Sequence, residues 1–159
     1  MKRILMIAVP SFLIGAVTGA VLWYLASPLW IDRVVAEDLA RGAGAMTIAE
    51  GRFRDADAVH KGAGLARIVA LSDGGVEVQL SEFAVTNGPD LELWLSDHPD
   101  PAKAGDVTGG KWISLGPLRG NIGDQSYRIP AGTDLSRYRS VVVWCEQFGV
   151  LFSPAPLGS

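Results

Sequence analysis

The sequence predicts an all-β fold, either an antiparallel β-sandwich or a partly closed barrel, preceded by one N-terminal transmembrane helix. Three observations predict this fold. Residues 4–25 form an apolar run without a charged side chain, and the rest of the chain consists of short apolar stretches separated by turn residues. No long helix is predicted outside the membrane region. We therefore expect three parts: a transmembrane anchor (1–31), a juxtamembrane helix with a linker (32–46) and a β domain (47–159).

The apolar run, "ILMIAVPSFLIGAVTGAVLWYL", is long enough as a helix to cross a hydrocarbon core of about 30 Å. Trp23, Tyr24 and Trp30 lie at its distal end, where aromatic side chains favour the membrane interface. A cleaved signal peptide is the alternative, but its apolar stretch is usually only about 7–15 residues long. Because Tyr24 is also too bulky for a cleavage site at Tyr24-Leu25-Ala26, the sequence favours a retained anchor.

Charges on either side of the run predict its orientation. Lys2 and Arg3 precede it, whereas Asp32, Arg33, Glu37 and Asp38, mostly acidic, follow it. The positive-inside rule then predicts a cytoplasmic N-terminus and a periplasmic C-terminal domain. The C-terminal part has no basic cluster, so we expect the membrane, through residues 4–25, and no nucleic acid as a partner.

The segment "DRVVAEDLAR", residues 32–41, is predicted to be a helix. Asp32 can cap its N-terminus, Arg41 lies in its last turn and Gly42 follows directly. The stretch "GAGA" at 42–45 then predicts a flexible joint between this helix and the β domain.

The β domain is predicted to contain seven or eight short strands. The clearest signal is a hairpin, in which Asp73-Gly74-Gly75 separates two apolar stretches. We expect a long polar loop at 97–110 and one helical turn in "DLSRY". The predicted strands lie in "MTIAEGRF", "LARIVAL", "VEVQLSEF", "LELWLSD", "KWISLGPL", "YRIP" and "RSVVVWCEQFGVLFSPAPL".

Common catalytic motifs are not found in the sequence. It has no phosphate-binding glycine loop, no HExxH, no GxSxG and no CxxCH. His60 with Asp55 and Asp57 could supply metal ligands, although one histidine in a solvated loop is more common. His98 in "SDHPDP" is typical of a turn. The sequence thus offers no motif of a stand-alone enzyme.

Cys145 is the only cysteine, so the chain has no internal disulfide and no CxxC pair. Strand alternation places Cys145 on the same face as Val141 and Val143, and Trp144 on the other face with Val142 and Phe148. Cys145 could be a small apolar core residue or a redox-active thiol. The nearest basic residue before it, Arg139, is six positions away, so the local sequence shows nothing that would activate the thiol.

Several pieces of the β domain, in order, match one family pattern. They are "GRF" at 51–53, His60 and Gly64, Phe83 followed by "NGPDL", "LGPLRGNIGDQSYRIP" at 115–130, and "VVVWCEQFGVLFSPAPL" at 141–157. From about Thr47 to Leu157 the chain resembles the DM-thirteen domain, also called the electron-transfer DM domain, in a membrane-anchored form of bacterial type. The segments "NGPDL" and "GDQSY" are interpreted as turns rather than as ligand-binding segments.

The resemblance implies an extracytoplasmic β domain with a redox or electron-transfer role centred on Cys145. It implies that the cysteine acts as a bare thiol or through a bound group such as haem, with His60 as a second ligand or hydrogen-bond partner. The chain carries no cytochrome-like domain, so a separate redox protein would have to be its partner. The alternative is a non-enzymatic binding or scaffolding domain of the cell envelope in which Cys145 is a core residue.

Overall fold

The computed structural model describes residues 2–27 and 31–158, and the chain divides into two compact units, Met1–Ile31 and Asp32–Ser159. The first unit consists of helix α1, Lys2–Ala26, which contains Pro10. Its segment Met6–Tyr24 is long and apolar enough to cross a membrane. It fits a single-pass membrane protein, and a signal sequence would meet the same criteria of length and composition. The predicted interfacial Trp30 lies outside the described residues.

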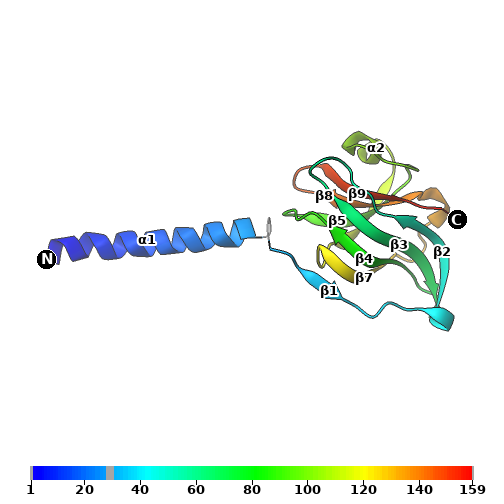
Figure 1. Ribbon diagram of the computed structural model, residues 1–159, viewed down its shortest axis with the longest axis horizontal. Coiled ribbons are helices and arrows are strands. Elements are labelled where there is room, and N and C mark those ends of the chain that lie inside the picture. The colour runs from blue at the N-terminus through cyan, green and yellow to red at the C-terminus, as the bar shows by residue number, and fades with distance from the viewer. Residues whose placement is uncertain (1, 28–30, 159) are drawn as a thin grey trace. The chain divides into compact units, whose positions relative to one another are not determined.

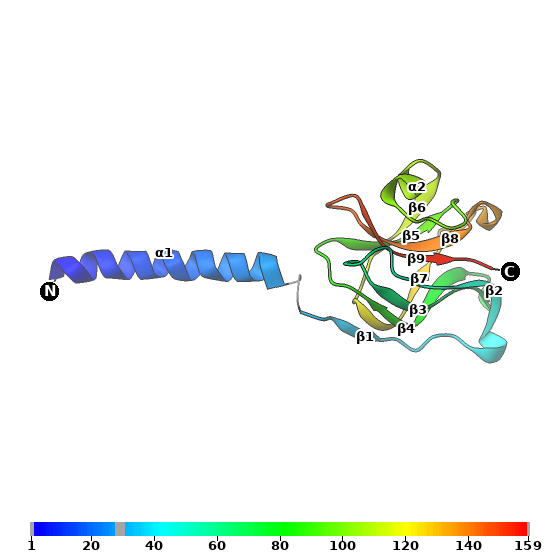
Figure 2. The ribbon, with the colours of Figure 1, turned by 45° about the horizontal axis from the view of Figure 1, so that its top comes forward.

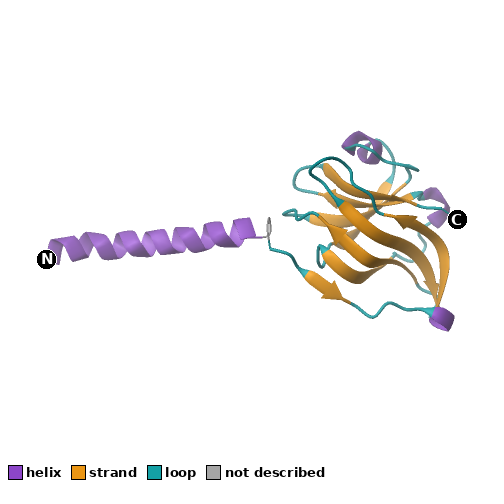
Figure 3. Ribbon diagram, viewed as in Figure 1, coloured by secondary structure: helices purple, strands orange, loops and turns teal. Residues whose placement is uncertain are grey.

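The second unit is a sandwich of two β-sheets, drawn as orange strands in Figure 3. One sheet has the strand order β1-β7-β4-β3-β2 and the other has the order β6-β5-β8-β9 (Figure 1). The predicted sandwich is confirmed, and the described strands do not close into a barrel. The strands are β1 Val34–Ala36, β2 Ala45–Arg52, β3 Gly62–Leu71, β4 Val76–Val85, β5 Leu91–Ser96, β6 Trp112–Pro117, β7 Ile122–Arg128, β8 Ser140–Cys145 and β9 Val150–Pro156.

The predicted hairpin forms between β3 and β4. Gly74 has a φ of 81°, a conformation that glycine adopts without a steric penalty. The backbone N–H of Gly75 donates to the Asp73 carboxylate, and the N–H of Leu71 donates to the carbonyl of Gly75. Local turn chemistry therefore fixes the register of the two longest strands.

The helix predicted at residues 32–41 is not observed, and this segment contains β1 instead. β1 pairs in parallel with β7, with Val34 opposite Ile122 and Ala36 opposite Asp124. Side chains hold the segment on both sides of β1: Asn121 donates to Asp32, and Glu37 accepts from the backbone and hydroxyl of Ser126. The helical signals are local, and the hydrogen bonds offered by the edge of β7 outweigh them. We call residues 32–41 the strap.

Two glycines of the domain make room for the strap. A Cβ atom on Gly123, whose φ is 103°, would lie 1.9 Å from the carbonyl oxygen of Val35. A Cβ atom on Gly120 would lie 2.3 Å from the carbonyl oxygen of Arg33. The interpretation of "GDQSY" as a turn is wrong, because all five residues belong to β7. Gly123 serves close approach between two strands rather than chain reversal.

The remaining short elements lie in the connections. The predicted polar loop contains the short helix α2, Ala104–Thr108, and the predicted helical turn is the 3-10 helix η3, Leu135–Arg137. A further 3-10 turn, η2, Gly42–Gly44, precedes β2. In Figure 2, α2 lies beside β6 of the four-stranded sheet. Its Val107 is fully buried, so α2 covers part of that sheet.

Two apolar clusters stabilise the sandwich. The main core contains residues of both sheets, including Phe83 and Leu93, and is enclosed between them. A smaller cluster on the outward face of the four-stranded sheet joins Trp94, Trp144 and Val107 of α2. Adjacent residues of β8 belong to different clusters, as strand alternation requires. The parity predicted for Cys145 and Trp144 is confirmed, except that Phe148 lies in the following turn and is exposed.

We predict that Gly123→Ala releases the strap and lowers the free energy of unfolding by on the order of 3 kcal/mol, because strain at positive φ is added to a backbone clash. Gly132→Ala is the matched control, since Gly132 has a φ of 81° but open space around it. It should cost roughly 1–2 kcal/mol. Urea unfolding measures both changes, and trypsin should cut after Arg33 and Arg41 faster in Gly123→Ala only. Equal cleavage of the two variants would contradict this account of the strap.

Candidate functional site

Cys145 is the last residue of β8 and is fully buried. It lies opposite Leu91 of β5 on one side and Val150 of β9 on the other, and its side chain belongs to the main core. Among the described residues, the thiol makes no hydrogen bond and no ion pair. Its surroundings are therefore those of an apolar core residue.

Two connecting segments meet where β8 ends at Cys145. The N–H of Glu146 donates to the carbonyl of Asp90, in the segment that leads into β5. The N–H of Gly149 donates to the carbonyl of Cys145 and closes the β8–β9 turn. Phe148 at this turn is 63% exposed. Cys145 itself is fully buried, so a group from solvent cannot reach it in the conformation observed. We call residues 146–149 the β8–β9 turn.

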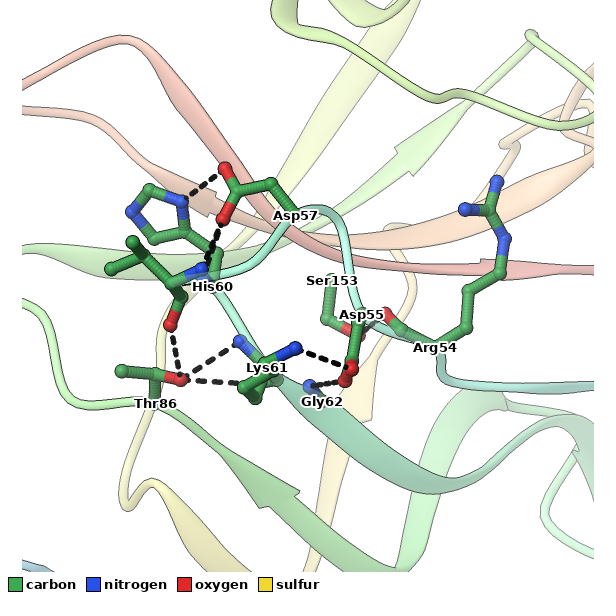
Figure 4. Close-up of polar contacts among 9 residues, drawn as sticks. Arg54, Asp55, Asp57, His60, Lys61, Gly62, Thr86 and Ser153 are labelled. Carbon is green, nitrogen blue, oxygen red and sulfur yellow. Dashed lines mark hydrogen bonds and ion pairs between the residues drawn. The ribbon is translucent and has the colours of Figure 1, made fainter.

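His60 lies in a polar loop between β2 and β3, and Asp57 determines its position (Figure 4). One carboxylate oxygen of Asp57 accepts hydrogen bonds from the backbone N–H groups of Val59 and His60, both at 2.7 Å. The other oxygen lies 2.7 Å from Nδ1 of His60. These bonds, the one to the His60 ring above all, lower the pKa of Asp57 to about 2. Asp57 is therefore ionised at neutral pH.

An ionised carboxylate only accepts hydrogen bonds, so Nδ1 of His60 must carry the proton. In the neutral imidazole, Nε2 then holds the free lone pair. Nε2 makes no hydrogen bond to a described residue, and in Figure 4 it lies on the side of the ring away from Asp57. A carboxylate that orients a histidine in this way is common behind metal-binding imidazoles.

The His60 ring also packs against Phe152, with ring centroids 4.3 Å apart and planes tilted by 52°. Phe152 is buried and belongs to the same core cluster as Cys145. Among the described residues, no hydrogen bond, ion pair or ring contact joins His60 directly to Cys145. The two predicted site residues therefore lie on the same core cluster, with His60 at its surface and Cys145 inside.

The other acidic residue of the predicted metal set has a different role. Asp55 accepts from Nζ of Lys61 at 3.0 Å and from the backbone of Gly62, and these bonds lower its pKa. Thr86 accepts from the N–H of Lys61 and closes the loop against β4. Within the described ranges, no three histidine, cysteine, aspartate or glutamate side chains gather as metal ligands would. Asp55 thus stabilises the loop through Lys61 and Gly62, whereas Asp57 is the carboxylate that bonds to the His60 ring.

The residues observed do not form a ready haem site. A haem ligand must reach the iron from the wall of a cleft, whereas the Cys145 thiol is enclosed on the inner face of β8. Of the two predicted ligands, His60 has the chemistry of a ligand, with its oriented ring and its Nε2 free of hydrogen bonds to described residues. The sequence pointed to His60 but not to Phe152, the ring that supports it, because their contact depends on the sandwich bringing distant segments together.

Taken together, the structure defines a class: a β-sandwich domain, preceded by an apolar helix, with one buried thiol and one carboxylate-oriented histidine. The family model described as electron transfer DM13 matches residues 52–157, which include strands β3 to β9 of the sandwich. The chain therefore belongs to the DM13 family, as the sequence resemblance indicated. Comparisons with curated proteins and with solved structures found no match.

We predict that Asp57→Asn makes the stability of the domain less dependent on pH in acid. Because the pKa of Asp57 is about 2 when folded and near 3.8 when unfolded, the ionised carboxylate favours the folded state above pH 4. This contribution is lost as the pH falls from about 4 to about 2. The midpoint of thermal unfolding should therefore fall less steeply over this range in Asp57→Asn than in the wild type. Identical slopes would show that the Asp57–His60 pair contributes nothing to folding.

Proposed function

We propose that this chain is a single-pass membrane protein whose DM13 domain lies in the periplasm and exchanges electrons with a separate redox protein. The observation that carries the proposal is the electron transfer DM13 match over residues 52–157. The apolar segment Met6–Tyr24 supports anchoring, and Lys2 and Arg3 before it support a cytoplasmic N-terminus.

Cys145 is the proposed redox residue of this module. It is the only cysteine of the chain, and a thiol is the side chain most readily oxidised reversibly. Because Cys145 is buried, the reaction must begin with local opening of the structure, and we place this opening at the β8–β9 turn that follows Cys145. Once the turn is open, the thiol can lose one electron to the partner and one proton to solvent.

His60 is the proposed contact point for that partner or for a bound group. Asp57 orients its ring, and Nε2 holds a lone pair that can accept a proton or ligate a metal. The Phe152 ring connects His60 to the core cluster that contains Cys145. This arrangement supports His60 as the contact point at the surface and Cys145 as the redox residue in the core behind it.

A second candidate function is a non-enzymatic binding or scaffolding domain of the cell envelope. The observation that favours it is the complete burial of Cys145 among apolar side chains. In this alternative the connecting segment Asn87 to Asp90 would carry binding, and Cys145→Ala would weaken packing without changing the affinity for a partner.

The two candidates differ in how the thiol becomes accessible. If the β8–β9 turn opens locally at a cost of about 2.8 kcal/mol, alkylation of the folded chain should be about 10²-fold slower than that of the unfolded chain. Low urea concentrations should leave this rate unchanged, because local opening exposes little surface. The experiment is maleimide labelling of the full chain in detergent, followed by mass spectrometry. Labelling that occurs only through global unfolding would overturn the redox role of Cys145 and support the second candidate.

An absorption spectrum of the same preparation, recorded oxidised and reduced, tests the role of His60. If the purified chain carries a chromophore, His60→Ala should remove or shift its bands, because the lone pair of Nε2 is lost. His98→Ala is the matched control, since Nδ1 of His98 accepts a hydrogen bond from the backbone of Asp100 within a turn. Equal spectra for the wild type and His60→Ala would exclude His60 as a ligand.

A further inference from the structure

Three tryptophans stack on the outward face of the four-stranded sheet. The rings of Trp94 on β5 and Trp112 on β6 lie 3.8 Å apart between centroids, with their planes within 9° of parallel. The rings of Trp94 and Trp144 on β8 lie 5.0 Å apart, with planes 27° apart. Trp94 is therefore the middle ring of a continuous aromatic stack, which we call the tryptophan stack.

The stack leads from the protein surface into a buried cluster. Trp112 lies on an edge strand and is 41% exposed, whereas Trp94 and Trp144 are each 2% exposed. Val107 of α2 packs in the same cluster as the two buried rings. An electron can thus leave the buried rings through Trp112, which both contacts Trp94 face to face and meets solvent.

A carboxylate lies at the polar atom of the middle ring. The indole N–H of Trp94 donates to Oε2 of Glu92 at 2.7 Å, and the hydroxyl of Ser114 donates to the same oxygen at 2.6 Å. Glu92 is two residues before Trp94 on β5 and lies opposite Trp144 on β8. A neutral acceptor would satisfy the indole N–H equally well. A carboxylate can in addition take up the proton, and the N–H of an indole becomes strongly acidic once the ring has lost an electron.

We propose that Trp94 is a redox-active residue, oxidised through Trp112, with Glu92 as its proton acceptor. A high-potential one-electron oxidant of the metal-oxo or organic-radical class takes one electron from Trp112 and is itself reduced. Trp94 then returns one electron to Trp112, and its N–H proton moves to Glu92. The products are a neutral Trp94 radical and a protonated Glu92. One electron from a reductant of the thiol or hydroquinone class, together with the proton on Glu92, restores the starting state.

This inference goes beyond the proposed function, because its steps use neither Cys145 nor His60. The two redox positions, Cys145 and Trp94, also belong to clusters on opposite faces of the four-stranded sheet. Cys145 belongs to the main core, while its neighbour Trp144 belongs to the outward cluster. Each position can therefore be removed without removing the other.

The test uses the full chain in detergent with Trp23→Phe and Trp30→Phe as background, which leaves the three tryptophans of the stack. A ruthenium(III) complex generated by a laser flash serves as the oxidant. Transient absorption and electron paramagnetic resonance distinguish a neutral tryptophan radical from a protonated radical cation. We expect the neutral radical in the background chain and its loss in Trp94→Phe. Trp112→Phe should slow its formation, because the exposed relay is missing.

Glu92→Gln is the decisive variant, because glutamine retains an acceptor for Trp94 and Ser114 but cannot take up the proton. We expect the radical to persist as the protonated cation in this variant. Cys145→Ala should leave the neutral radical unchanged, which separates this proposal from the one for Cys145. The proposal is overturned if Glu92→Gln forms the neutral radical at the rate of the background chain. It is equally overturned if Trp94→Phe, shown to be folded by circular dichroism, forms the radical in the same yield.

Discussion

The register of β8 between β5 and β9 is the constraint on which the rest of the sandwich depends. All six residues of β8 are buried, so both faces of this strand must pack against other elements. Its inward face contributes Val141, Val143 and Cys145 to the core between the sheets, and its outward face contributes Val142 and Trp144 to the second cluster. A shift by one residue would exchange the two faces. It would turn the thiol to the outward face and the large Trp144 ring into the core between the sheets.

The same register also separates two kinds of chemistry. The thiol lies inside, on a core cluster that reaches the surface at Phe152 and His60. The tryptophan stack lies outside, with one carboxylate at its middle ring. Ala56, in the loop that orients His60, packs against the second cluster. The polar loop between β2 and β3 thus touches both regions, and its conformation depends on the hydrogen bonds of Asp55 and Asp57.

Local patterns in the sequence predicted those features that depend on local interactions. Alternation along "VVVWC" predicted which neighbours share a face with Cys145, and Asp73-Gly74-Gly75 predicted the hairpin. The helix predicted for the strap is wrong, because its local helical signals compete with the edge of β7, which is formed by residues far along the chain. The contacts that support the site were not predicted either. No motif links the Phe152 ring to His60 or the Glu92 carboxylate to the tryptophan stack, and both arrangements become visible only once the strands are paired.

The strap has a consequence for the solubility of the domain. Residues 34–36 pair with residues 122–124, the first half of the outer edge of β7. Further along the same edge, the Glu37 carboxylate accepts a hydrogen bond from the N–H of Ser126. Burial raises the pKa of Glu37, but hydrogen bonds from Arg119 and Ser126 outweigh it and hold that pKa below its usual value. The carboxylate therefore stays ionised and acts as a charged gatekeeper. A fragment beginning after Arg41 would present a bare strand edge, which is a template for edge-to-edge association between copies.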